Sequence, residues 1–175
     1  MVRYAKRMEQ LTNSDIGDLL KLIARPDIIS FAGGLPAAEL FPVDQLCQAC
    51  DAVMKEMGKV ACQYSSTEGF PALREKIAER MKAKNNIETD ADHILVTSGS
   101  QPGLDFSASV FVEKGDVILM ESPSYLGAIN AFKACEPTFM EVPTDEDGMV
   151  MEELEKILAT TPNVKMIYVL SLIHI

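Results

Sequence analysis

The sequence has none of the features of a membrane protein and few of those of a nucleic-acid-binding protein. No apolar run approaches the roughly 20 residues that a membrane-spanning helix needs, and the N-terminal region lacks the apolar core of a signal peptide. The 16 Lys and Arg residues are outnumbered by 26 Asp and Glu residues, which gives a net charge of −10. Such a surface repels phosphate-rich polymers and anionic lipids. We therefore expect a cytoplasmic protein that binds neither nucleic acid nor membranes.

Histidine is scarce, and the cysteines lack the spacing of metal ligands. The two histidines, His93 and His174, show no pattern of a catalytic triad. Cys47 and Cys50 form a CxxC motif inside a helical stripe of apolar residues expected over 44–57, which places both thiols on the buried face. A zinc site would need a second ligand pair at suitable spacing, and none is present. We predict packing cysteines, no metal, and a compartment that keeps thiols reduced.

The second half of the sequence alternates between short apolar runs and helical patterns. With 175 residues the chain is long enough to bury a real core. Strands are expected at Ile94–Val96, Asp116–Met120, Thr138–Val142 and Lys165–Val169. Helices are expected at Pro102–Val112, Tyr125–Cys135 and Met151–Leu158, the last with Leu154, Ile157 and Leu158 facing inward. This alternation predicts an α/β fold with a mostly parallel sheet and flanking helices.

In the first half of the sequence, the pattern of residues predicts mainly helices. Residues 1–43 form an N-terminal arm, with a short amphipathic helix over 16–23 and a glycine turn at Gly33-Gly34. A helix over 44–57 follows. Another helix begins at Pro71, with one apolar face formed by Phe70, Leu73, Ile77 and Met81. We expect residues 44–169 to form part of one larger domain.

One predicted turn has the features of a phosphate site. Thr97-Ser98-Gly99-Ser100-Gln101 joins the expected strand at Ile94–Val96 to the next helix. A turn of this kind directs free N–H groups and the positive end of the helix dipole to one point. Tyr125 follows the next strand and would lie at the same sheet edge, where a ring can stack on a flat ligand. The alternatives are a turn that binds nothing and a tyrosine that only packs.

Four sequence blocks together resemble a known family. They are SFAGGLPAAELFP (30–42), CQYSSTEGFPALREKIAERM (62–81), SGSQ (98–101) and ESPSYLGAINAF (121–132). In this order they resemble the fold-type I aminotransferases of class I/II, which depend on pyridoxal 5'-phosphate (PLP). The 2-aminoadipate/kynurenine subgroup is the most similar, and the effector domains of MocR-type regulators resemble it too. The resemblance extends from about Ile16 to Val169.

The resemblance implies a function for individual residues. It implies that the PLP phosphate is held by Gly99, Ser100 and Gln101. Tyr125 would stack on the cofactor ring, and Gly34 would contact the substrate through its backbone. The hydroxyl of Tyr64 would reach the cofactor phosphate of the neighbouring subunit, so the resemblance also implies a homodimer.

The groups that carry out transamination are expected outside this sequence. The chemistry needs a Lys for the Schiff base, an Asp for the pyridinium nitrogen and an Arg for the substrate carboxylate. In the family these follow the position of Val169, so we predict no catalytic residue here and no activity of this chain alone. The whole protein would transfer an amino group between an amino acid and a 2-oxo acid. This sequence departs from the family pattern at two positions. Gly17 stands where relatives selective for long acidic substrates carry Arg, and Pro102 stands where relatives carry a second Gln.

The last six residues depart from the family pattern. An Asn-Pro-Thr-Gly motif is expected after the last strand, but the sequence reads Leu170-Ser171-Leu172-Ile173-His174-Ile175. One back-translation of this tail is the transposon end sequence used to prepare sequencing libraries. We therefore expect residues 170–175 to be non-native, the alternative being a genuine short protein with a divergent end.

Two other functions fit the same resemblance. The chain could be the PLP-binding effector domain of a MocR-type transcription regulator, which a winged-helix region would precede. Only a short arm precedes the resemblance here, which disfavours a regulator unless the start of the sequence is also truncated. The other alternative is a fragment that binds without catalysis.

Overall fold

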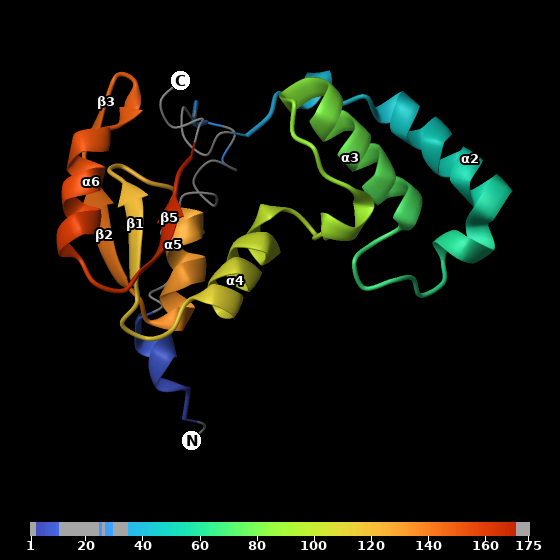
Figure 1. Ribbon diagram of the computed structural model, residues 1–175. Helices are drawn as coiled ribbons and strands as arrows, with labels where there is room; N and C mark the ends of the chain where they lie inside the picture. Colours follow the sequence, from blue (N-terminus) through green and yellow to red (C-terminus); the bar gives the residue numbers. More distant parts are fainter. Residues whose placement is uncertain (1–2, 11–24, 26, 30–34, 171–175) are drawn as a thin grey trace. The chain divides into compact units, whose positions relative to one another are not determined.

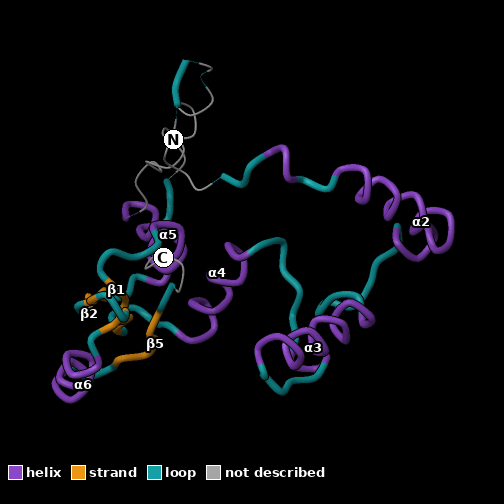
Figure 2. The backbone as a smooth tube through the Cα atoms, turned by 90° about the horizontal axis from the view of Figure 1, so that it is seen from above, coloured by secondary structure: helices purple, strands orange, loops and turns teal. Residues whose placement is uncertain are grey.

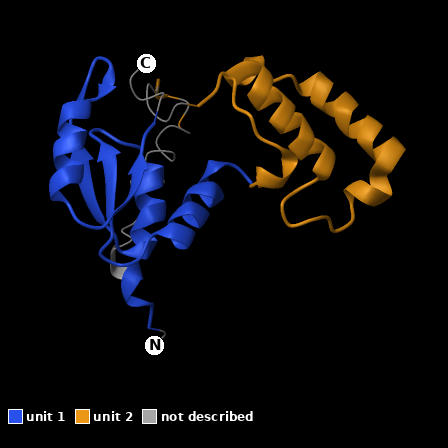
Figure 3. Ribbon diagram, viewed as in Figure 1, with its two compact units in different colours: residues 1–14, 98–175 blue, residues 15–97 orange. Residues whose placement is uncertain are grey.

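The computed structural model describes residues 3–10, 25, 27–29 and 35–170, and it divides into two compact units (Figures 1 and 3). The first unit comprises Met1–Ser14 and Ser98–Ile175, and the second comprises Asp15–Thr97. The helix predicted over 16–23, the Gly34 turn and residues 171–175 lie outside the described residues.

A three-stranded parallel sheet forms the centre of the first unit. Its strands are β1 (Val117–Glu121), β2 (Thr138–Val142) and β5 (Val164–Tyr168), in the order β2-β1-β5. Both neighbours run parallel to β1. The predicted α/β class is confirmed, and the predicted bounds of the three strands hold to within one residue. The chain moves from β1 outward to β2 and returns to the other side of β1, as in doubly wound sheets.

Helices cover both faces of this sheet. On one face lie α4 (Ser100–Phe111) and α5 (Leu126–Phe132), and on the other lies α6 (Met151–Thr160). The unit also contains the short helices η1 (Lys6–Gln10) and η4 (Lys133–Cys135) and a hairpin of β3 (Thr144–Asp145) and β4 (Gly148–Met149). Figure 2 shows the sheet between α5 and α6. Because side chains alternate along a strand, Ile118 and Met120 pack with α4 and α5, whereas Val117 and Leu119 pack on the side of α6.

The second unit contains helices but, among its described residues, no strand. They are η2 (Ala38–Leu40), α2 (Val43–Ala61), α3 (Pro71–Asn85) and η3 (Ala91–His93). The prediction that Cys47 and Cys50 are buried is wrong, because both are exposed and α2 buries none of its residues. Amphipathic spacing defines a stripe, but a stripe is buried only where another element covers it, and no described part of the second unit does so.

Three other predictions of packing are corrected in the same way. Ile94–Val96 is not a strand: Leu95 is exposed, and the Val96 N–H donates to the Glu68 carbonyl oxygen at 2.9 Å. A strand needs neighbours for its N–H and C=O groups, and β1 is already flanked by β2 and β5. Leu158 is exposed, although Leu154 and Ile157 do face the core. On α3 the buried residues are Arg74 and Ala78, while Leu73 is exposed.

Candidate functional site

The glycine turn before α4 forms the first part of the site. α4 begins at Ser100, two residues before the predicted start, and Gly99 is its N-cap with φ +86° and ψ −176°. Only glycine adopts this backbone conformation readily. No atom lies within 4 Å of the position of an added Cβ at Gly99, so backbone conformation rather than crowding requires the glycine. The first N–H groups of the 12-residue helix have no partner within the helix, and N–H groups in this position are suited to binding an anion.

Gln101 links this turn to the start of α5. Its Nε2 donates to the Gly127 carbonyl oxygen at 3.0 Å, a bond between residues 26 positions apart. α4 and α5 also pack against the same core. The structure therefore brings the predicted residues Gly99, Ser100 and Gln101 to the helix that Tyr125 begins.

Tyr125 is held in place by a glycine. It is the N-cap of α5, and 39% of its surface is exposed. A Cβ added at Gly127 would lie 2.5 Å from Cζ of the Tyr125 ring, so the ring packs directly on the Gly127 backbone. Any side chain at position 127 would displace it. The ring thus has a defined orientation at the carboxyl end of β1, where open α/β sheets bind ligands.

The segment between β1 and Tyr125 is braced by polar side chains. Ser122 Oγ donates to Glu141 Oε2 at 2.9 Å, and Thr144 Oγ1 donates to the Ser122 carbonyl oxygen at 3.1 Å. Ser124 Oγ is buried and has no hydrogen-bond partner among the residues that the structure describes. A buried hydroxyl without a partner costs free energy, and a polar ligand group beside it would remove that cost.

A buried carboxylate lies at the same sheet edge. Glu121 ends β1 and is buried, and its Oε2 accepts the Leu170 N–H at 2.8 Å. Burial raises the pKa of the Tyr168 hydroxyl above its ordinary value, and the neighbouring Tyr125 and Glu121 raise that pKa further. Tyr168 is therefore neutral at physiological pH and available as a hydrogen-bond donor.

These features fit a phosphorylated aromatic cofactor. The turn at Gly99 offers N–H groups and the Ser100 hydroxyl for a phosphate, and Tyr125 offers a ring face. Tyr64, the other predicted contact, is 99% exposed in the second unit. Gly34 lies outside the described residues. Among the described residues, no cluster of His, Cys, Asp and Glu could hold a metal ion.

Three residues of this site carry little signal in the sequence. Gly127, Ser124 and Glu121 were not predicted to contribute. Gly127 lies in the first turn of a predicted helix, and this was a usable signal, because glycine is unfavourable in helices and often marks a close approach of another group. Nothing in the local pattern indicated that Ser124 is buried or that Glu121 caps the backbone after β5.

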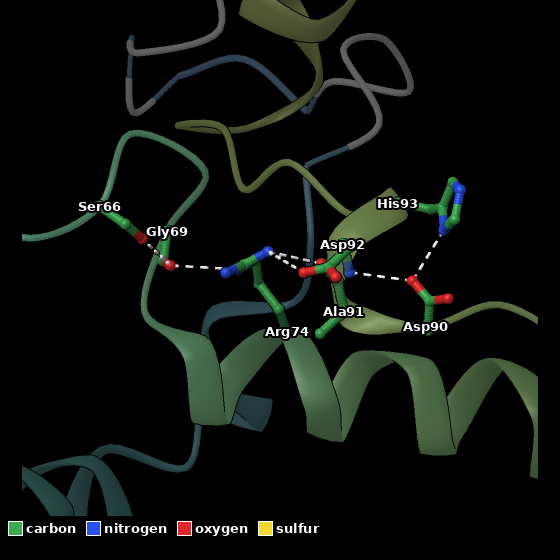
Figure 4. A network of polar contacts seen from close by, with 7 residues as sticks. All are labelled: Ser66, Gly69, Arg74, Asp90, Ala91, Asp92 and His93. Carbon is green, nitrogen blue, oxygen red and sulfur yellow. Dashed lines mark hydrogen bonds and ion pairs between the residues drawn. The ribbon is translucent and has the colours of Figure 1, made fainter.

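A second polar network lies at η3, in the second unit. Asp90 Oδ1 accepts the Asp92 N–H at 3.0 Å and lies 2.7 Å from His93 Nδ1 (Figure 4). The hydrogen bond and charge of Asp90 raise the pKa of His93 above 6.5, and the hydrogen bond to His93 lowers the pKa of Asp90 below 3.8. The pair therefore stabilises η3 fully between pH 3.8 and pH 6.5, the ordinary pKa values of the two groups. This stabilisation is lost as the pH rises through the raised pKa of His93 or falls through the lowered pKa of Asp90.

Replacing Asp90 with asparagine is expected to lower the pKa of His93 toward 6.5, because the charged partner is removed. An NMR titration of the His93 ring protons measures this pKa directly. The control is Asp105→Asn on α4, which should leave the titration of His93 unchanged. An equal His93 pKa in wild type and Asp90→Asn would contradict the pairing.

Comparison with known proteins identifies relatives over most of the chain. The family model Aminotransferase class I and II matches residues 27–173. The chain is 43% identical over 155 residues to a 2-aminoadipate transaminase of Thermus thermophilus, covering 89% of this chain and 38% of the relative. It is 40% identical over 153 residues to aromatic-amino-acid aminotransferase 1 of Thermococcus litoralis, covering 87% and 37%.

The fold is also similar to that of a solved aminotransferase. The structure superimposes on the kynurenine aminotransferase of Pyrococcus horikoshii, solved in complex with PMP, with a TM-score of 0.85 and 35% identity. That match covers 94% of this chain and 42% of the other. The chain thus spans about two fifths of the length of its relatives. None of the described helices is long and apolar enough to cross a membrane. By sequence and by fold, the chain belongs to the aminotransferase class I and II family, whose members depend on PLP.

Proposed function

We propose that the whole protein transfers amino groups between amino acids and 2-oxo acids with PLP as its cofactor. The observation that carries the proposal is the junction of the Gly99 turn and Tyr125 at one sheet edge, joined by the bond from Gln101 to Gly127. A phosphate site beside an oriented aromatic ring suits a phosphorylated pyridine. The family supports the same function.

This chain supplies binding and orientation rather than proton transfer. The backbone N–H groups after Gly99 and the Ser100 hydroxyl would hold the phosphate, and the Tyr125 ring would offer its face to the pyridine and exclude water. When bound, PLP supplies an electron sink that stabilises the carbanion left at the amino-acid Cα. Gly34 contacts the substrate, and Tyr64 reaches the phosphate of the neighbouring subunit in a homodimer, both as the family resemblance implies.

The amino acid is proposed only as a class. The relatives named above act on 2-aminoadipate, on aromatic amino acids and on kynurenine. These substrates share an amino acid end and differ in the side chain. Gly17 lacks the guanidinium that would pair with a second carboxylate. We therefore propose a preference for side chains without a distal carboxylate.

The double variant Ser100→Ala, Gln101→Ala tests the phosphate site. We expect its dissociation constant for pyridoxamine 5'-phosphate (PMP) to rise about tenfold or more, because hydrogen bonds to a charged phosphate are lost. Calorimetry on the whole protein measures this constant. Ser107→Ala is the matched control, because Ser107 lies on the same helix and its Oγ donates only to the Gly103 carbonyl oxygen, at 2.8 Å.

Two outcomes separate the competing functions. An unchanged PMP affinity in the double variant would remove Ser100 and Gln101 from the site. Exchange of an isotope-labelled amino group between an amino acid and its 2-oxo acid tests the transamination itself. Binding of PLP without any exchange would contradict transamination and favour a regulator that uses PLP as a ligand.

A further inference from the structure

Arg74 is a charged residue buried in the second unit. It lies near the start of α3, and only 9% of its surface is exposed. Removing a guanidinium from water is costly unless its N–H groups find acceptors. The hydrogen-bond acceptors of Arg74 therefore indicate the structural role of this buried residue.

The partners of Arg74 are backbone carbonyls from two separate segments (Figure 4). Its Nε donates to the Gly69 oxygen at 3.2 Å, and its Nη1 donates to the Ala91 oxygen at 2.6 Å. The carboxylate of Asp92 lies 4.0 Å from Nη1, but its side chain is 94% exposed, so this ion pair contributes little. The guanidinium is thus a link between two backbone segments rather than half of a salt bridge.

The two segments also contact each other directly. The Val96 N–H donates to the Glu68 carbonyl oxygen at 2.9 Å. Gly69 has φ +106°, and a Cβ added there would lie 2.8 Å from the side chain of Val96. Ser66 Oγ donates to the Gly69 oxygen at 2.7 Å, so this carbonyl accepts from both Ser66 and Arg74. The turn at 66–69 is therefore held tightly against the segment 91–96.

Each segment continues into a residue to which a cofactor contact is proposed. Tyr64 comes just before the turn at 66–69, and Val96 comes just before the turn that contains Gly99. The oxygens that Arg74 contacts belong to Gly69, Ala91 and Asp92, which precede or follow these two residues along the chain. Its effect on a bound phosphate would therefore be transmitted through the backbone.

We propose that Arg74 is a positioning residue that fixes the backbone leading to Tyr64 and to the Gly99 turn at the same time. The inference rests on the proposed function, because phosphate binding is what gives these two segments a common role. A planar guanidinium can donate to two carbonyls in different directions, whereas a lysine ammonium is a point charge that cannot hold both in this geometry. Because Tyr64 is proposed to serve the neighbouring subunit, one arginine would adjust a phosphate contact in each of two sites.

The test compares PMP with pyridoxamine, which differ only in the phosphate. Both dissociation constants are measured on the whole protein by calorimetry, and their ratio isolates the contribution of the phosphate. For Arg74→Lys we expect the preference for PMP over pyridoxamine to fall about tenfold, the effect of losing a hydrogen bond to a charged group. The affinity for pyridoxamine should stay near that of the wild type. Arg80→Lys, an exposed position on the same helix, should change neither affinity.

The outcomes distinguish this inference from the function on which it rests. A folded Arg74→Lys variant with an unchanged ratio overturns the positioning role, even if its melting temperature falls. Equal affinity of the wild type for both ligands contradicts the proposed function instead. If Arg74→Lys does not fold, Ser66→Ala decides: this exposed change removes one bond to the Gly69 oxygen. It should lower the preference about two- to threefold, and an unchanged preference overturns the inference.

Discussion

Replacing Phe132 with alanine is expected to lower the free energy of unfolding by about 3–5 kcal/mol, the range for removing a large aromatic side chain from a core. Phe132 is 1% exposed and lies among residues of α4, α5 and β1. Its ring also makes an edge-to-face contact with Tyr168, with the centroids 5.5 Å apart. The alanine variant would leave a cavity between the sheet and α5. Urea unfolding followed by circular dichroism measures the change.

Phe111→Ala is the matched control for this prediction. Phe111 is at the end of α4 and 62% exposed, so its removal leaves no cavity. We expect a change within about 0.5 kcal/mol, as for ordinary surface substitutions. Equal losses in the two variants would show that Phe132 does not lie in a closed core.

Replacing Gly99 with alanine is expected to weaken phosphate binding about tenfold or more, because the N–H groups proposed to bind the phosphate would be redirected. At φ +86° and ψ −176° an alanine is strained by about 1–3 kcal/mol. No neighbouring atom would clash with the new Cβ, so the strain is released by rotation of the backbone rather than by movement of a side chain. The PMP dissociation constant and the free energy of unfolding are both measured on the whole protein.

Two other glycine variants are controls for Gly99→Ala, and they distinguish the effect of backbone strain from the loss of the phosphate-binding turn. Gly115 also has positive φ, at +88°, and Gly115→Ala should cost stability without changing PMP affinity. Gly58 lies within α2, where a new Cβ would meet only Met54 at an ordinary 3.8 Å. Gly58→Ala should therefore be neutral or stabilising by up to about 1 kcal/mol. Loss of PMP affinity in Gly115→Ala would mean that stability, not the turn, sets phosphate binding.

The strands and helices of the first unit could be predicted from the sequence because their signals are local. The period of apolar residues over 138–142 predicted β2 at its observed bounds, and the pattern around Tyr125 predicted the start of α5. The turn at Gly99 before α4 was predicted for the same reason, because a glycine-serine turn before a helix is a local feature. Phosphate binding at this turn stays a prediction. The α/β class followed from the order of these elements.

Predictions that needed a partner distant in the sequence were the ones that failed. Ile94–Val96 is apolar enough for a strand, but a strand forms only where a neighbouring backbone accepts and donates, and Glu68 supplies a single bond. Cys47 and Cys50 share a helical face as predicted, yet no described element of the second unit covers that face. Spacing alone determines which residues lie together on a face, and packing determines whether the face is buried.

In the candidate site, too, local features could be predicted from the sequence, whereas contacts between elements could not. The sequence by itself determined the turn, the helix starts and the residue types that suit a phosphate and an aromatic ring. Only the tertiary structure decided that Gln101 would bond to Gly127, that Tyr125 would rest on that glycine, and that Arg74 would be buried between two carbonyls. These contacts join separate elements, and their geometry depends on how strands and helices pack, which no local pattern of residues encodes.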